Sequence, residues 1–229
     1  MAMSEVVEAH TSLIPVINRL GIHLGLKDKS VREVCQEYGL DSDFVLVIIN
    51  TFLNEEYFPE KKMKTFHLSL IVDYLNKTNQ YYLRYQLPNV SRHLDLFIHH
   101  STSDNPTLKL MGKFFQNFKE CLINQIRYDE QVWFPYCLST LADSPNSESL
   151  AIVKDMRGTT LKEEDSTEAL LTDLKSIMIK HLSGDYDENL CYAVLFAIAT
   201  LEKDIKQHNR IRERILKPMI RNKHNIKVR

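Results

Sequence analysis

The sequence predicts an all-α protein in which a small three-helix domain (residues 1–60) precedes an antiparallel, up-down four-helix bundle (residues 61–229). Three observations favour this fold. Only 6 of the 229 residues are Gly, and long stretches repeat apolar residues every three or four positions, as amphipathic helices do. The Asn-Gly and Asp-Gly pairs typical of β-hairpins do not occur in the sequence.

Capping and breaking residues define the predicted helices of the small domain. Pro15 interrupts or kinks the first helix, and Gly21 ends it because Gly takes the left-handed conformation easily. Ser30 and Glu33 have the spacing of a capping box, which begins the second helix. Asp41 offers a side-chain oxygen to cap the third. The three helices are expected over about residues 4–20, 30–39 and 41–53, followed by a linker over residues 55–62.

Four longer helices are expected in the bundle. Pro88 lies inside the first and predicts a kink, Pro135 predicts the end of the second, and Pro218 predicts a distortion near the end of the fourth. Residues 142–167 are expected to be rich in loops. The four helices are predicted over about residues 67–101, 107–134, 168–182 and 187–220.

Charge is balanced over the whole chain but not along it. There are 29 Lys and Arg against 30 Asp and Glu, so no net field attracts the molecule to nucleic acid or membranes. Residues 206–229 hold nine Lys and Arg against one acidic residue, Glu213. Residues 221–229 are therefore expected to form a solvated basic tail that is available to an acidic partner.

The cellular compartment and the state of the cysteines are predicted from motifs that the sequence lacks. It shows neither a signal peptide nor an apolar run long enough to span a membrane, so a cytoplasmic protein is expected. The four cysteines are scattered without a C-x-x-C pair, which predicts free thiols. A phosphate-binding glycine loop, a nucleophile elbow and a catalytic-triad motif are also missing, which favours a non-catalytic protein.

Each bundle helix places polar residues on its inward stripe. In the last helix, His208 and Arg212 interrupt an apolar seam with steps of three and four residues. A buried ionised group costs several kcal/mol unless it is paired, so these residues need an explanation. One explanation is that they bind a metal, and the other is that they form a hydrogen-bonded polar layer. The residues alone favour the polar layer. The other inward polar residues are Asn79, Gln125, Asp129 and His181, and His93 and His100 share one face of the first long helix, two turns apart.

Several motifs, in order, resemble the hemerythrin-like bundle of the iron–sulfur cluster repair di-iron proteins. The matching segments are Gln86-Leu-Pro88, Asp129 to Pro135, Met178-Ile-Lys-His181, Asp204 to His208 and Ile215-Leu-Lys-Pro218. Residues 13–22 and 30–35 resemble the small domain that precedes the bundle in that family. The resemblance implies a bridged di-iron centre with histidine and carboxylate ligands, and a role in repair after nitrosative or oxidative stress.

The implied ligand set is incomplete in this chain. His181, His208 and one of His99 or His100 match ligand histidines, and Asp129 matches a bridging carboxylate. Elsewhere the sequence departs from the family: Asn79 lies where an early histidine is expected, Gln125 where another is expected, and Arg212 where the second carboxylate is expected. A degenerate metal site follows as a hypothesis.

In this hypothesis Arg212 neutralises Asp129 or Glu130, and His181, His208 and Gln125 complete a polar core. A mononuclear metal site formed by His181, His208 and Asp129 is the alternative. The sequence therefore predicts no cofactor, with iron as the alternative.

Three functions compete. The first is a regulatory or stress-related binding protein that has an unidentified protein partner, or senses stress through its cysteines, with a homodimer left open. The second is an iron-binding protein for iron–sulfur cluster repair or for oxygen and nitric oxide chemistry. The third is a DNA-binding regulator, because residues 31–45 have helix-turn-helix spacing. Residues 44–50 are apolar rather than basic, which argues against nucleic acid as a partner.

Overall fold

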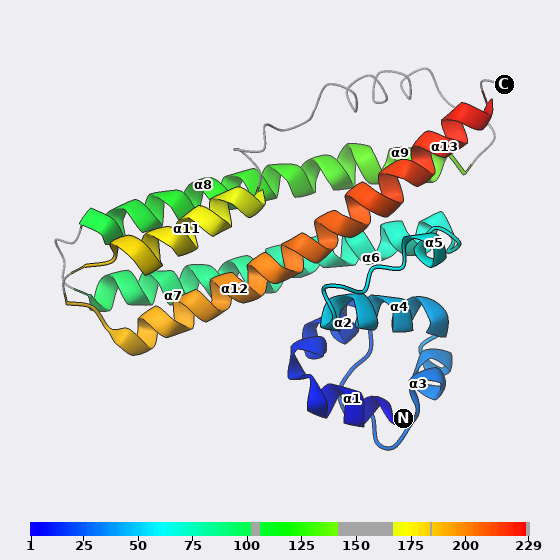
Figure 1. Cartoon of the computed structure of the whole chain (residues 1–229), viewed down its shortest axis with the longest axis horizontal. Coiled ribbons are helices and arrows are strands. Elements are labelled where there is room, and N and C mark those ends of the chain that lie inside the picture. Colours follow the sequence, from blue (N-terminus) through cyan, green and yellow to red (C-terminus); the bar gives the residue numbers. More distant parts are fainter. Residues whose placement is uncertain (102–105, 142–166, 184, 228–229) are drawn as a thin grey trace. The chain divides into compact units, whose positions relative to one another are not determined.

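The computed structural model describes residues 1–101, 106–141, 167–183 and 185–227, with side chains as far as residue 222. Every regular element within these ranges is a helix, which confirms the all-α prediction (Figure 1). The chain divides into two compact units, which we call unit 1 (residues 1–78 and 207–229) and unit 2 (residues 79–206). The prediction that residues 142–167 are rich in loops falls almost wholly outside the described residues.

Local capping determines the first helices of unit 1. Ser30 and Glu33 form the predicted capping box: the amide of Ser30 donates to Oε2 of Glu33 at 2.7 Å, and the amide of Glu33 donates to Oγ of Ser30. Oδ1 of Asp41 accepts from the amides of Asp43 and Phe44, both at 2.9 Å. The helices are α1 (Met3–Ala9), η1 (Thr11–Leu13), α2 (Ile14–Arg19), α3 (Val31–Glu37), α4 (Ser42–Leu53) and α5 (Glu60–Met63).

The first predicted helix, over residues 4–20, is divided at His10 rather than at Pro15. His10 has φ −139° and ψ 74°, which lie outside the helical region, and its carbonyl accepts from the amide of Leu13. Pro15 lies in the first turn of α2, where its missing N–H costs no helical hydrogen bond. The helix does end at Gly21, whose φ is +84°, as predicted.

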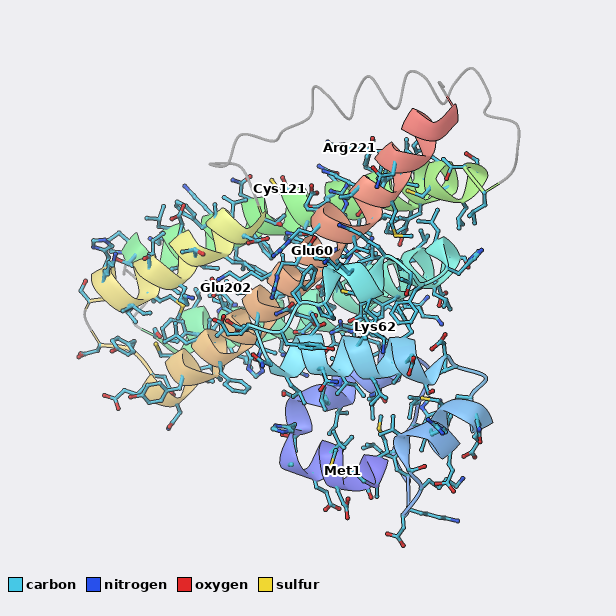
Figure 2. All side chains as sticks on the ribbon, turned by 45° about the vertical axis from the view of Figure 1, so that its right-hand side comes forward. Met1, Glu60, Lys62, Cys121, Glu202 and Arg221 are labelled. Carbon is cyan, nitrogen blue, oxygen red and sulfur yellow. The ribbon has the colours of Figure 1, made fainter. Side chains whose placement is uncertain are left out.

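Unit 1 also includes the connection after α4 and the C-terminal helices. The guanidinium carbons of Arg210 and Arg214 lie 4.3 and 4.8 Å from the ring centroid of Phe58. Arg210 donates to the carbonyl of Glu55 at 3.0 Å, and Arg214 pairs with Glu60, which is labelled in Figure 2. These contacts join residues 207–229 to residues 55–60 within unit 1.

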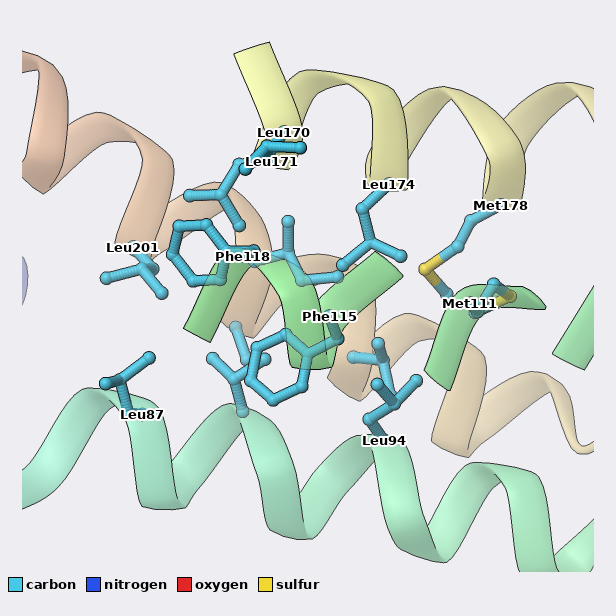
Figure 3. Close-up of a cluster of buried hydrophobic side chains, with 14 of the residues drawn as sticks. Leu87, Leu94, Met111, Phe115, Phe118, Leu170, Leu171, Leu174, Met178 and Leu201 are labelled. Atoms are coloured by element: carbon cyan, nitrogen blue, oxygen red, sulfur yellow. The ribbon is translucent and has the colours of Figure 1, made fainter. Parts of the chain in front are cut away.

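Unit 2 is built around one apolar core. Phe97, Phe118 and Leu174 come from three different helices and are fully buried. Figure 3 shows these helices with side chains of α7, α8, α11 and α12 directed into a common cluster. The helices of this region are α6 (Leu68–Tyr81), α7 (Leu87–His100), α8 (Pro106–Tyr128), α9 (Phe134–Ser139), α11 (Thr167–His181) and α12 (Glu188–Ile211); α6 and α12 each extend into unit 1.

A π-helical turn precedes each of three prolines, Pro88, Pro135 and Pro218. In each case the residue just before the proline donates its amide to the carbonyl five residues earlier; for Pro135 this is Phe134 to Asp129. Proline cannot donate to the carbonyl four residues earlier and its ring clashes with it, so a wider turn keeps the helix continuous. The π turns are η2 (Tyr82–Gln86), η3 (Asp129–Trp133) and η5 (Arg212–Leu216).

The helix distortions and the helix end predicted at these three prolines have different outcomes. The distortions expected near Pro88 and Pro218 are confirmed as η2 and η5. The predicted helix end at Pro135 is wrong, because η3 carries the helix on into α9. After η5, α13 (Lys217–Lys227) extends the last helix well into residues 221–229, which were expected to form a tail.

Among the residues that the structure describes, none of the helices combines the length and the apolar character that a membrane crossing requires.

Candidate functional site

Buried polar residues of unit 2 gather where α6 adjoins η3. The Nε2 group of Gln80 donates a hydrogen bond of 2.5 Å to Oε1 of Glu130, which places the two segments side by side. Asn79 and Asp129 directly precede this pair in the sequence and are 1% and 0% exposed. We call Asn79, Gln80, Asp129 and Glu130 the polar layer. It combines two amides with two carboxylates.

Two buried hydrogen-bond donors belong to the segments that form this layer. Nδ2 of Asn79 and Nε1 of Trp133 are buried and donate no hydrogen bond to any residue that the structure describes. Gln86 donates to the hydroxyl of Tyr81 at 2.9 Å. Gln125, four residues before Asp129, is only half-buried. A buried donor without an acceptor costs about 1–3 kcal/mol, so these two donors could still bind an acceptor.

Two of the predicted metal ligands lie far from the polar layer. His181 is the last residue of α11 and is exposed, and its carbonyl accepts from Oγ1 of Thr107 at the start of α8. Asp129 follows the far end of α8, which has 23 residues and a length of about 34 Å. His100, also exposed, is the last residue of α7, six positions before α8 begins. The structure therefore brings neither histidine to Asp129.

Neither of the remaining histidines of α7 is fully buried. His99 is exposed and His93 is half-buried.

His208 belongs to unit 1, where it is 4% exposed. Burial is the main cause that lowers its pKa, from 6.5 to about 3, and the positive charge of Arg212 lowers it further. Arg19, 6% exposed, adds a smaller effect in the same direction. Nδ1 of His208 lies 3.5 Å from Oδ1 of Asn209. His208 is therefore a neutral imidazole at physiological pH.

Arg212 is the first residue of η5 and is mostly buried. Its Nη1 lies 3.0 Å from Oε1 of Glu213, and its side chain is 13% exposed. Glu213 itself is 47% exposed and also accepts from Lys217 at 2.6 Å. Glu213, which follows the seam residue Arg212, is thus bound to two basic side chains.

These positions do not fit a di-iron centre of the kind that the resemblance implies. Such a centre needs histidines and bridging carboxylates around one point, whereas His181 and His100 lie a helix length from Asp129. Within the described ranges, no group of three or more His, Cys, Asp or Glu side chains is arranged to hold a metal ion. The mononuclear alternative that combines His181 with Asp129 fails for the same geometric reason.

A buried carboxylate that sequence reasoning missed connects α11 and α12. Glu202, labelled in Figure 2, is 5% exposed and accepts from Oγ1 of Thr172 at 3.1 Å, from Lys206 at 2.9 Å and from Lys175. Burial acts to raise the pKa of Glu202, but the lysine and threonine hydrogen bonds outweigh it and lower the pKa. The i, i+4 spacing of Glu202 and Lys206 was the one signal in the sequence.

The cysteines give little support to thiol-based sensing. Cys35, Cys137 and Cys191 are buried, and burial raises the pKa of the Cys35 and Cys191 thiols. A raised pKa keeps a thiol protonated and poorly nucleophilic. Only Cys121, labelled in Figure 2, is partly exposed among the four.

The second helix of the helix-turn-helix pattern, α4, is mostly buried. Phe44, Val45 and Ile48 are at most 5% exposed. The exposed positions of the helix are Asp43, Leu46 and Asn50, so it presents no basic side chain to a DNA groove.

No family model matches this sequence, and a search of curated proteins finds no match either.

Proposed function

We propose that this chain is a hemerythrin-like helical protein with a degenerate di-iron site, and that it acts in the cytoplasm as a regulatory or stress-related binding protein without catalytic activity. Two features of unit 2 support the proposal. Chain direction alternates along α7, α8, α11 and α12, as in an up-down bundle (Figure 1). These four helices also share one apolar core.

The separation of His181 from Asp129 carries the proposal. If α11 and η3 jointly held iron, the histidine would have to lie beside the carboxylate, yet α8 separates the two by about 34 Å. Glu130, next to Asp129, is bound by the Gln80 amide at 2.5 Å. This hydrogen bond supports a polar layer in the segment where the family has a bridging carboxylate.

A binding function is favoured over catalysis because three buried groups, Glu202, His208 and Cys191, are poorly suited to proton transfer or nucleophilic attack. Glu202 is held by three donors, His208 is neutral, and the Cys191 thiol is protonated. Nucleic acid is a poor partner for a chain whose charges balance and whose α4 offers no basic side chain. The proposed partner is accordingly a protein.

Anaerobic addition of ferrous iron tests this proposal through the unfolding temperature. A metal that binds only the folded state raises the unfolding temperature as its concentration rises. We expect no change with iron, and none when a chelator is added to the purified protein. A saturable increase that the chelator reverses would contradict the proposal and favour the second function, iron-dependent cluster repair or oxygen and nitric oxide chemistry.

A further inference from the structure

The outer face of α12 exposes two large aromatic side chains one turn apart. Tyr192 is 67% exposed and Phe196 is 77% exposed. Together with Asn189, Ala199 and Lys203, they follow steps of three, four, three and four residues. This is the spacing of a seam at which one helix packs along another. Because Val194, Ile198 and Leu201 fill the inward seam of the same helix, the outer seam is a separate surface.

Charged residues lie at both ends of this seam, and their signs are opposite. Glu188 is the exposed first residue of α12, next to Asn189, whereas Lys203 is half-buried and ends the seam eight residues before the helix does. Glu188 and Lys203 are equally distant in sequence from the point between Leu195 and Phe196. Tyr192 and Ala199 are equally distant from that same point. Over residues 188–203, an antiparallel copy of the helix would therefore place Glu188 opposite Lys203 and Tyr192 opposite Ala199.

We propose that the outer face of α12 pairs with the same face of a second copy of this chain, in antiparallel orientation about a two-fold axis near Phe196. Each Glu188 then lies opposite the Lys203 of the other copy, twice per dimer. Each Tyr192 lies opposite a small Ala199, and the two Phe196 rings meet at the centre. A parallel arrangement would place like charges together, which costs free energy.

The interface is small, which determines how the dimer behaves. The face from Glu188 to Lys203 covers 16 residues of one helix, a length of about 24 Å. One helix pair of this length buries less surface than an obligate dimer does. The proposal therefore predicts a reversible dimer whose population rises with protein concentration. It is independent of the proposed function, because it requires neither iron nor its absence.

Sedimentation equilibrium of the full chain over a wide concentration range is the test. We expect association in the wild type and at least a tenfold weaker association in Phe196→Glu, because two buried carboxylates would face each other. Ile179→Glu is the matched control: Ile179 is 66% exposed on α11, outside the proposed interface, so association should not change. Circular dichroism verifies that both variants fold.

Charge reversal distinguishes a second copy from any other occupant of this face. Glu188→Lys alone and Lys203→Glu alone should each weaken the dimer, because each creates two like-charged pairs. The double variant should restore association, since its pairs are again opposite in sign. A wild type that stays monomeric at every concentration would overturn the proposal. So would a dimer that ignores Phe196→Glu, or a double variant that is not restored.

Discussion

Replacing Glu202 by Gln should destabilise the packing of α11 on α12. The carboxylate is 5% exposed and receives hydrogen bonds from Thr172 on α11 and from Lys206, as well as from Lys175 on α11. Gln keeps the size of Glu but removes the negative charge. Its amide nitrogen would then point toward an ammonium group, and two donors cannot satisfy each other.

The expected loss follows from the exposure of each partner. Lys206 is 49% exposed and lies one turn away on the same helix, so its pair contributes only about 0.3–0.5 kcal/mol. Lys175 is 32% exposed and joins two helices, and a buried hydrogen bond to a charged group contributes about 1.5–3 kcal/mol. We therefore expect Glu202→Gln to lower the free energy of unfolding by about 2 kcal/mol at neutral pH.

Urea unfolding at several pH values measures this loss. The pKa of Glu202 is lower in the folded protein than its ordinary value of 4.5, so its stabilisation is complete above that value and disappears as the pH falls below it. The difference between wild type and variant should narrow accordingly in acid. Glu37→Gln is the control, because Glu37 and its partner Lys29 are 53% and 43% exposed, and losing an exposed pair should change stability far less than Glu202→Gln does. A variant with wild-type stability at neutral pH would refute the reasoning.

Four further substitutions test other parts of the structure. His208→Gln should make the free energy of unfolding depend less on pH below pH 6.5. In the wild type the pKa of His208 is about 3 in the folded protein, below its unfolded value, so unfolding takes up a proton in this range. The free energy of unfolding of the wild type therefore falls by about 1.4 kcal/mol for each pH unit. Equal slopes in urea titrations of the two proteins would contradict this. Phe118→Ala in the fully buried core should cost about 3–5 kcal/mol. Phe196→Ala, at a position that is 77% exposed, should change the free energy of unfolding at low protein concentration by less than about 0.5 kcal/mol. Similar urea midpoints for Phe118→Ala and Phe196→Ala would be contrary evidence. Cys121→Ser should abolish the fast phase of thiol modification in the native protein, and rapid labelling of Cys191 would show that burial does not protect it.

Local signals in the sequence predicted the parts of the fold that depend on a few neighbouring residues. The capping box of Ser30 and Glu33 and the Asp41 cap both form at the expected positions, because each needs only backbone amides within three residues. Apolar spacing likewise predicted the helices, since a buried face depends on periodicity alone.

Pro135 shows where a local rule fails. A proline inside a helix removes one hydrogen bond, which predicts an end or a kink. The side chains beyond it, Tyr136 and Cys137, are 4% and 0% exposed. Burying them favours a continuous helix over a broken one, and the π turn at residues 129–133 accommodates the proline. Tertiary packing therefore decided the outcome, and packing partners distant in sequence are not visible in a local pattern.

His181 shows the same limit for the candidate site. It shares a stripe with Leu174 and Met178, both of which are buried, so periodicity placed it inside. The helix ends at His181, however, and a terminal residue does not need to follow the burial of the turn before it. Glu202 was missed for a related reason: its partners Thr172 and Lys175 lie on another helix, about thirty residues away in sequence.

Iron analysis of the purified protein tests the central claim most directly. The full chain would be produced with iron in the growth medium, purified without chelator, and measured for iron per chain together with its Mössbauer spectrum. A polar layer in place of a metal centre predicts far less than one iron per chain and no spectrum of coupled irons. Close to two irons per chain with a two-metal spectrum would contradict it.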